Sequence, residues 1–323
     1  MTVAWTRSVG AAALVAVATV LAVAGCGEAE PSGPEVTLRV TRDFGNELID
    51  AERLPLDGHR TVLRLLEENH EVDASEYGGI EAIDGLRARN ARFDGDQDQT
   101  WAINVNGIEN DYGVDELRLF PGDVVQLDLR DWYVTLDVRA TVGAFPQPFT
   151  GGMLGRRFPV TVRCAPGFGT ACGEVRRALR AAGVDPSGRE PAGKPPARAL
   201  GQLRRASILV GPWRHWRDRA WPRRIDRGPR YSGVFARFSP NAKIVRLLDW
   251  DANQAGRLGV GTGLIAAMRP TSTDLLWLVT GTDRQGVERA ARALDSRAIE
   301  DAFAAIVTGA GVRKIPLVAP WGG

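Results

Sequence analysis

The chain has 323 residues, of which 44% are apolar and 25% are charged, and its formal net charge is +2. This composition belongs to a globular protein long enough for two domains of roughly 100–200 residues each. It excludes a fibrous or wholly disordered chain.

Charge is divided unevenly along the chain. Residues 34–134 carry 10 Lys and Arg against 23 Asp and Glu, whereas residues 135–323 carry 30 against 14. An acidic half followed by a basic half indicates two domains. Opposite potentials of this kind orient two partners against each other.

Residues 1–25 are predicted to be a lipoprotein signal peptide. Arg7 supplies a positive start, residues 8–25 are almost wholly apolar, and small residues precede Cys26. Such a pattern is typical of a secretory signal, and "VAGC" resembles a bacterial lipobox. The resemblance implies cleavage before Cys26 and a diacylglyceryl group on its sulfur. A plain transmembrane anchor is the alternative, although an apolar run of about 17 residues is at the low edge for a span.

The predicted anchor sets the localisation. Residues 26–34 are polar and rich in Pro and Gly, so we expect a flexible tether. We therefore predict a folded part outside the cell, held at the extracytoplasmic face of the membrane through the lipid.

The acidic half begins with an alternating strand near residue 36 and a helix that Thr61 can cap. Residues 101–105 alternate again, and Asn106-Gly107 predicts a hairpin turn because both residues tolerate positive φ. The Pro121-Gly122 pair fits a type II turn before a last strand.

Four segments of this half resemble the transcobalamin C-terminal-like β-grasp domain: "TVLRLL", "GGIEAIDG", "TWAINVNG" and "YGVDELRLFPGD". The resemblance implies a β-grasp domain at 35–134. The strand and helix patterns of residues 135–323 predict an α/β domain with a mixed sheet after it, so the expected fold class is α+β. In the carriers of this family the domain covers one face of a corrinoid. The ligand implied is therefore a corrinoid-like or other cofactor-sized molecule, with an import transporter as a partner.

The candidate ligand-binding residues of this half are Trp101, Asn106 and Tyr112. The aromatic rings of Trp101 and Tyr112 can form a flat surface for a ligand at one end of the β-grasp domain. For Trp101 a core position is favoured over ligand binding, since it begins an alternating strand and large aromatic side chains bury well. The alternate acids of 94–98 can supply oxygen ligands to Ca²⁺. However, the EF-hand pattern fails at Gln99, so a solvated acidic loop is favoured and no metal is predicted.

The basic half predicts alternating strands and helices. Strands are expected at 156–165, 206–213, 232–238, 243–250, 263–270, 274–282 and 314–319, and helices at 173–184, 284–294 and 298–307. Thr282 and Gln285 form a candidate capping box for the helix at 284–294. A Pro/Gly-rich loop at 185–202 separates the first helix from the strands.

Cys164 and Cys172 are predicted to form a disulfide. They are the two cysteines that follow Cys26, and the seven residues between them include two Gly and a Pro, so the chain can turn back. An exported protein favours such a bond. A metal or redox pair is the weaker alternative, because the spacing is not C-x-x-C and no His lies nearby.

Residues 203–230, which we call the Arg–Trp segment, carry nine Arg interleaved with three Trp. Arginine recognises phosphate and carboxylate by paired hydrogen bonds and stacks on aromatic faces. Arg214, Trp216 and Arg217 are the candidate ligand-binding residues here. An anionic envelope polymer, a phosphorylated lipid headgroup, a ligand that carries phosphate or a protein is the expected partner, and export makes nucleic acid less natural. The alternative is that this surface packs against the acidic half.

Catalytic signatures are missing from the sequence. The three His form no H-E-x-x-H motif, and there is no G-x-S-x-G motif or P-loop. "GVGTG" at 259–263 fails the dinucleotide fingerprint because residue 264 is Leu. We therefore expect a membrane-anchored lipoprotein that binds a ligand for import, rather than an enzyme. The alternative is a surface-anchored interaction protein that binds an anionic envelope polymer or protein through the Arg–Trp segment.

Overall fold

Two hydrophobic clusters organise the computed structural model, which describes residues 1–2, 33–58, 60–75, 78–89, 99–109, 112–131, 138–189 and 203–318. The first cluster is formed by side chains between residues 36 and 129. The second extends from residue 138 to residue 315 and also contains Phe44 and Ile108 from the first half. Gly33–Gly323 form one compact unit. The predicted boundary between residues 134 and 135 lies outside the described residues, and the division into domains stays a prediction.

The first half of the chain builds a five-stranded sheet around a parallel pair of strands. Its order is β2-β1-β8-β6-β7, with β1 and β8 parallel and the other neighbours antiparallel. The strands are β1 (Glu35–Arg42), β2 (Glu47–Pro55), β6 (Gln99–Val105), β7 (Ile108–Glu109) and β8 (Val124–Asp131). Alternate residues of β1 point into the first cluster, because side chains alternate between the two faces of a strand.

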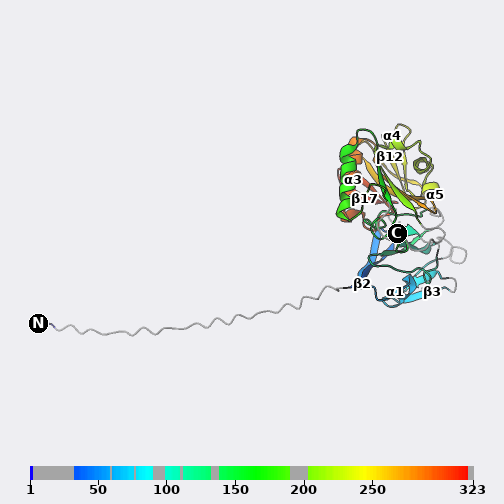
Figure 1. Cartoon of the computed structure of the whole chain (residues 1–323), viewed down its shortest axis with the longest axis vertical. Coiled ribbons are helices and arrows are strands. Elements are labelled where there is room, and N and C mark those ends of the chain that lie inside the picture. The colour runs from blue at the N-terminus through cyan, green and yellow to red at the C-terminus, as the bar shows by residue number, and fades with distance from the viewer. Residues whose placement is uncertain are drawn as a thin grey trace. The chain divides into compact units, whose positions relative to one another are not determined.

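Local sequence explains the connections of this sheet. Helix α1 (Val62–Glu67) begins where the Thr61 side chain accepts a hydrogen bond from Arg64 N, which confirms the predicted cap. Asn106 and Gly107 have φ values of 58° and 70° and join β6 to β7 as predicted. After α1 the chain forms a small sheet of order β3-β4-β5 (Figure 1). Its strands are β3 (Val72–Ala74), β4 (Ile80–Ile83) and β5 (Leu86–Arg87).

The second half builds a six-stranded mixed sheet with order β17-β16-β14-β15-β10-β9. Strand β10 pairs in parallel with both β9 and β15, and the remaining pairs are antiparallel. The strands are β9 (Val160–Cys164), β10 (Arg205–Val210), β14 (Gly263–Thr271), β15 (Asp274–Gly281), β16 (Ala304–Thr308) and β17 (Gly311–Ile315). Helix α3 (Gly169–Ala181) packs against β9, and α6 (Arg284–Ala293) packs against β14, β15 and β16 (Figure 1). The mixed α+β class is confirmed, with 18% helix and 40% strand among the residues that the structure describes.

An insertion between β10 and β14 contains short elements. They are α4 (Trp213–Trp216), the 3-10 helix η1 (Pro222–Arg227), α5 (Pro229–Ser232), β11 (Ala236–Phe238), β12 (Val245–Leu248) and β13 (Gln254–Leu258). The last three form an antiparallel sheet of order β11-β12-β13. The insertion therefore carries most of the Arg–Trp segment.

The prediction of a helix at 298–307 is wrong. The 3-10 helix η2 (Arg297–Ile299) occupies its start, and strand β16 occupies its end. Asp301 has a φ of 64°, which a helix cannot accommodate. The apolar residues that follow pair on both sides, with β14 and β17, so tertiary pairing outweighs their helical pattern.

Two further details differ from the sequence predictions. Helix α6 is capped by Asp283, whose side chain accepts a hydrogen bond from Gly286 N at 2.8 Å, and not by Thr282. Strand β2 was not predicted, because it is an edge strand with a mostly exposed, charged surface and no clear alternation.

The predicted disulfide between Cys164 and Cys172 is present and links the end of β9 to α3.

Candidate functional site

Three strands of the second sheet provide the floor of a cavity. On β10, residues 206, 208 and 210 are buried, and the alternate residues Arg205, Ser207 and Leu209 face the other way. Arg163 of β9 and Asp274 of β15 line the cavity beside them. The sheet thus presents a row of mixed polar and apolar side chains on this face.

The opposite wall begins where β10 ends at Gly211. Its φ of 153° favours glycine, and a Cβ there would overlap the Ala165 side chain and lie 3.1 Å from Trp216 Nε1. The close approach lets Trp216 pack against the end of β10, where it is only 5% exposed. Gly211 therefore allows the chain to turn over the floor.

Trp213 and Asp226 hold the wall in place. The Trp213 ring is fully buried and stacks on Phe238, with centroids 4.6 Å apart. Its Nε1 donates to Asp226 Oδ2 at 3.3 Å, and Asp226 Oδ1 accepts from Phe238 N at 3.1 Å. Burial raises the pKa of Asp226 against these hydrogen bonds. These residues anchor α4 and η1 to the strand β11.

The space between floor and wall, which we call the Arg–Trp cavity, has a volume of about 480 Å³. Its polar lining comprises Arg163, Arg205, Ser207, His215, Arg219 and Asp274. Its apolar lining includes Leu209, Trp216, Trp221, Pro222, Pro270 and Leu276. Concave sites of this size and mixed lining are typical of small-molecule binding.

The charges of the cavity are only partly compensated. Arg205 donates through Nε to Asp274 Oδ1. Burial disfavours the charge of Asp274, but hydrogen bonds from Thr271 and Arg205 outweigh it and lower the pKa of this carboxyl. Arg163 and Arg219 are exposed, and neither has an ion-pair partner among the residues that the structure describes. Counted over the described residues, the cavity therefore carries two guanidinium groups without an ion-pair partner.

The sequence candidates in the Arg–Trp segment are placed differently from one another. Trp216 lines the cavity, with His215 edge-on to it at a centroid distance of 4.5 Å. Arg214 is exposed and is not part of the lining. Arg217 donates to the Pro240 carbonyl oxygen and lies 3.4 Å from Asp226 Oδ2, so it holds the wall.

Arg163 was missed by sequence reasoning. It follows the alternation of β9, in which Val160 and Val162 are buried, so the pattern indicates only that its side chain faces outward. Nothing local places it opposite Arg219, 56 residues further along the chain. Arg219 and Trp221 belong to the Arg–Trp segment, but that pattern did not distinguish them from its other members.

The candidates of the first half lie elsewhere. Trp101 is 4% exposed in the first cluster, and its Nε1 donates to Leu86 O at 3.3 Å. Asn106 is fully buried and donates to Asp123 Oδ1 and Gly152 O, at 2.7 and 3.0 Å. Tyr112 is 39% exposed. Trp101 and Asn106 therefore support the fold here rather than lining either of the two cavities that we describe.

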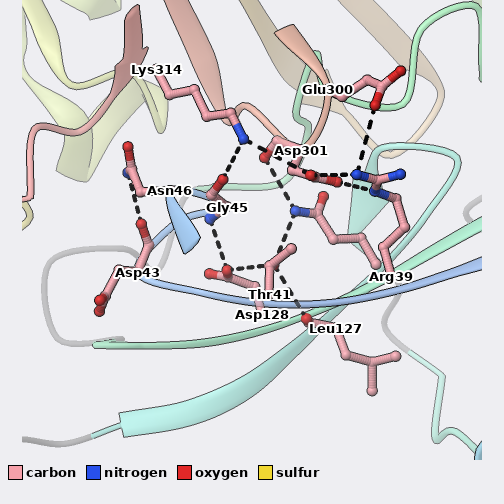
Figure 2. Close-up of polar contacts among 11 residues, drawn as sticks. Arg39, Thr41, Asp43, Gly45, Asn46, Leu127, Asp128, Glu300, Asp301 and Lys314 are labelled. Atoms are coloured by element: carbon pink, nitrogen blue, oxygen red, sulfur yellow. Dashed lines mark hydrogen bonds and ion pairs between the residues drawn. The ribbon is translucent and has the colours of Figure 1, made fainter. Parts of the chain in front are cut away.

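The two halves of the unit meet in a packed polar junction. Arg39 of β1 forms a two-pronged pair with Asp301, with 2.7 Å between Nη2 and Oδ2, and Gln126 Nε2 donates to Asp301 O at 3.1 Å (Figure 2). Lys314 Nζ donates to Gly45 O at 2.6 Å. Burial lowers the pKa of Lys314, although Asp301 opposes the shift. This junction fixes one half to the other, and its polar groups form hydrogen bonds with each other.

A second cavity, of about 580 Å³, belongs to the first half alone. Its lining includes Arg42, Arg87 and Arg89, and reaches residues 89 and 99, which border the undescribed residues 90–98. Neither cavity is lined by residues of both halves. The Arg–Trp cavity, whose surroundings are described, is therefore the better candidate site.

The loop before α6 suits an anion, but the Asp283 carboxylate accepts from Gly286 N and Gly261 N there. Within the described ranges, no three His, Cys, Asp or Glu come together in a way that could hold a metal ion. Cys26 and the acids of 94–98 lie outside these ranges. Among the described helices, none combines the length and hydrophobicity that a membrane span needs.

Comparison with known proteins bears on the first half. Residues 59–131 match the domain of unknown function DUF4430. DUF4430 is related to transcobalamin-like domains. One solved structure, described as "a putative metal binding protein" from Ruminococcus gnavus ATCC 29149, is 23% identical and has a TM-score of 0.26. The match covers 31% of this chain and 99% of that one. A search of curated proteins returned no match.

The DUF4430 match ends at residue 131, before the Arg–Trp cavity begins. The cavity therefore lies in the part of the chain that follows the matched domain.

Proposed function

We propose that this protein is a lipid-anchored extracytoplasmic binding protein that captures an anionic ligand in the Arg–Trp cavity. The observation that carries the proposal is the pair of exposed, unneutralised arginines, Arg163 and Arg219, in one concave site with Trp216. Guanidinium groups bind anions through charge-assisted hydrogen bonds. A cavity of about 480 Å³ fits a small molecule, or one terminal group of a longer anionic polymer.

The location rests on the N-terminal sequence. Arg7, the apolar run and Cys26 in "VAGC" support export and lipid attachment. The disulfide between Cys164 and Cys172 fits an oxidising compartment. Expression of the full chain in a bacterial host, with mass spectrometry of the N-terminus, tests this part. The expected product begins at a diacylated Cys26, and Cys26→Ser abolishes both lipid attachment and membrane retention.

Ligand capture is tested with probes that share a naphthyl ring and differ in the group attached to it. Isothermal titration at low salt compares 1-naphthol, which is neutral, with its anionic relatives 1-naphthoate, 1-naphthyl sulfate and 1-naphthyl phosphate. We expect at least one anion to bind about tenfold or more tightly than the neutral compound, because each charge-assisted contact is strong. Binding of all four with equal affinity, or of none, would refute capture of an anion here.

The matched variants are Arg219→Gln and Arg214→Gln. Both positions are exposed arginines at or near the end of α4, but Arg219 lines the cavity and Arg214 does not. Anion binding should fall in the first variant and persist in the second. A polyphosphate added in place of the small anions tests the polymer alternative, which predicts affinity that grows with chain length and falls steeply with salt.

A second candidate function is carriage of a corrinoid-like ligand by the first half. It is supported by the order β2-β1-β8-β6-β7 with β1 parallel to β8, which we propose is a β-grasp sheet of the transcobalamin C-terminal-like type. The match to DUF4430 is consistent with it. Titration with cobalamin and cobinamide, followed by absorbance and heat, tests this candidate. Absence of binding at micromolar concentrations removes it.

A further inference from the structure

The arginines of the Arg–Trp cavity are of two kinds. Arg205 is bound to Asp274, which also accepts hydrogen bonds from Thr271 and Thr273. This carboxylate is the acidic side chain of the cavity lining, and it neutralises one guanidinium. Arg163 and Arg219 therefore remain as an excess of two positive charges.

The two excess arginines come from opposite sides of the cavity. Arg163 extends from β9 in the floor, and Arg219 follows α4 in the wall. Asp218, the neighbouring carboxylate in the sequence, is exposed and does not line the cavity. A ligand that enters between floor and wall therefore has a guanidinium group on each side of the cavity.

The two excess positive charges of the cavity predict the charge of the ligand group that it binds. A carboxylate, a sulfate ester or a phosphate diester carries one negative charge and leaves one guanidinium unpaired. A phosphate monoester carries about −1.5 to −2 at pH 7 and has three acceptor oxygens. Arginine presents a planar fork of donors that matches such oxygens. The monoester is therefore the group that neutralises the cavity.

The rest of the lining describes the remainder of the ligand. Trp216, Trp221, Pro222 and Pro270 give the cavity a large apolar and aromatic share. Arg224 covers one side of the Trp221 ring at 4.4 Å from its centroid and fixes the orientation of the ring. An inorganic anion would leave this apolar surface exposed to water, whereas a ring or acyl group attached to the anion would cover it.

We propose that the Arg–Trp cavity binds a phosphate monoester attached to an apolar or aromatic group, with the phosphate between Arg163 and Arg219. This inference rests on the proposed function, because it names the class of anion that the same cavity takes. The phosphate can belong to a soluble compound or to a lipid headgroup, and the two share the chemistry that the cavity recognises.

The first experiment ranks the naphthyl series by titration calorimetry on the wild-type protein. 1-Naphthyl phosphate should bind about tenfold or more tightly than 1-naphthyl sulfate and 1-naphthoate, and inorganic phosphate should bind more weakly than 1-naphthyl phosphate. Equal affinity for the phosphate and the sulfate overturns the monoester assignment while leaving anion capture intact. Failure of every anion overturns the proposed function as well.

The variants test the two-arginine arrangement. Arg163→Gln and Arg219→Gln should each reduce affinity for 1-naphthyl phosphate about tenfold or more, and should remove its advantage over the sulfate. Arg214→Gln should bind as the wild type does. Because all three side chains are exposed, we expect unchanged melting temperatures, which separates loss of binding from loss of fold. A preference for phosphate that survives in either cavity variant refutes the arrangement.

The last arm distinguishes the sources of the phosphate. Dioctanoyl phosphatidic acid is a monoester with acyl chains, dioctanoyl phosphatidylglycerol is the matched diester, and glycerol 3-phosphate is the soluble headgroup. Tighter binding of the phosphatidic acid than of both others supports a lipid ligand. Tight binding of 1-naphthyl phosphate with no gain from acyl chains supports a soluble one. Equal binding of the mono- and diester lipids contradicts the proposal.

Discussion

A single turn fixes much of this molecule at the scale of residues. Asp43, Phe44 and Gly45 have φ values of 55°, 62° and 71°, so three successive residues adopt the left-handed conformation between β1 and β2. Phe44 enters the second cluster and contacts Phe235 and Phe303 edge-on, with centroids 5.3 Å away in each case. Gly45 N donates to Asp128 Oδ1 at 2.8 Å (Figure 2). The turn is thus strained locally and stabilised by tertiary contacts.

Gly45→Ala should be strongly destabilising. A Cβ at this position would overlap the carbonyl of Asp301 and would also have to adopt a positive φ. Strain and overpacking together predict a loss of about 3 kcal/mol or more in the free energy of unfolding, measured in urea. The control is Gly85→Ala, which has a φ of 79° but nothing within 4 Å, and should cost only about 1–2 kcal/mol. Equal losses in both variants would show that the close contact is unimportant.

Pairing across long sequence separations dominates at the scale of elements. Strand β1 carries Arg39, which reaches Asp301 just after η2 and so connects the first sheet to the segment entering β16. The Asp301 side chain is 3% exposed and Arg39 is 16% exposed. Local patterns did find the cap at Thr61, the Asn106-Gly107 turn and most strands, because those depend on near neighbours. They failed where distant strands, as at β16, impose the structure.

Arg39→Met should weaken the junction between these elements. It leaves the buried Asp301 carboxylate with Lys314, 3.9 Å away, as its remaining cation. Removing one partner of a buried pair costs about 3–5 kcal/mol, and Lys314 makes the lower end the expected value in urea unfolding. Arg42→Met on the same strand breaks an exposed pair with Glu47 and should cost less than about 1 kcal/mol. Comparable losses for the two variants would contradict the role given to the junction.

Buried acids link the stability of the whole molecule to pH. Burial raises the pKa of Asp123 and of Asp128 to about 6, against the hydrogen bonds that each accepts. A folded pKa above the unfolded value of about 3.8 means that the folded state binds the proton more tightly. The stabilisation is complete below the unfolded pKa and is lost as pH rises through about 6.

The protein should therefore be more stable near pH 5 than near pH 7.5. Each of the two groups should contribute about 1.4 kcal/mol to this difference, because pH 5 lies about one unit below its folded pKa of about 6. Urea unfolding at the two pH values measures the difference, and Asp128→Asn should reduce it by removing one titrating group. A free energy of unfolding that rises from pH 5 to pH 7.5 would contradict the assignment.

The sequence by itself determined the α+β class, the disulfide, the Asn106-Gly107 turn, the cap at Thr61 and the unusual Arg–Trp segment. Each of these depends on residues that are close in the chain or on the types of residue present. Only the tertiary structure decided that Arg163 and Arg219 share a cavity and that Asp274 neutralises Arg205, which is 69 residues away. The physical reason is that charge compensation acts through space, so its outcome depends on which strands pair and which side chains they bring together.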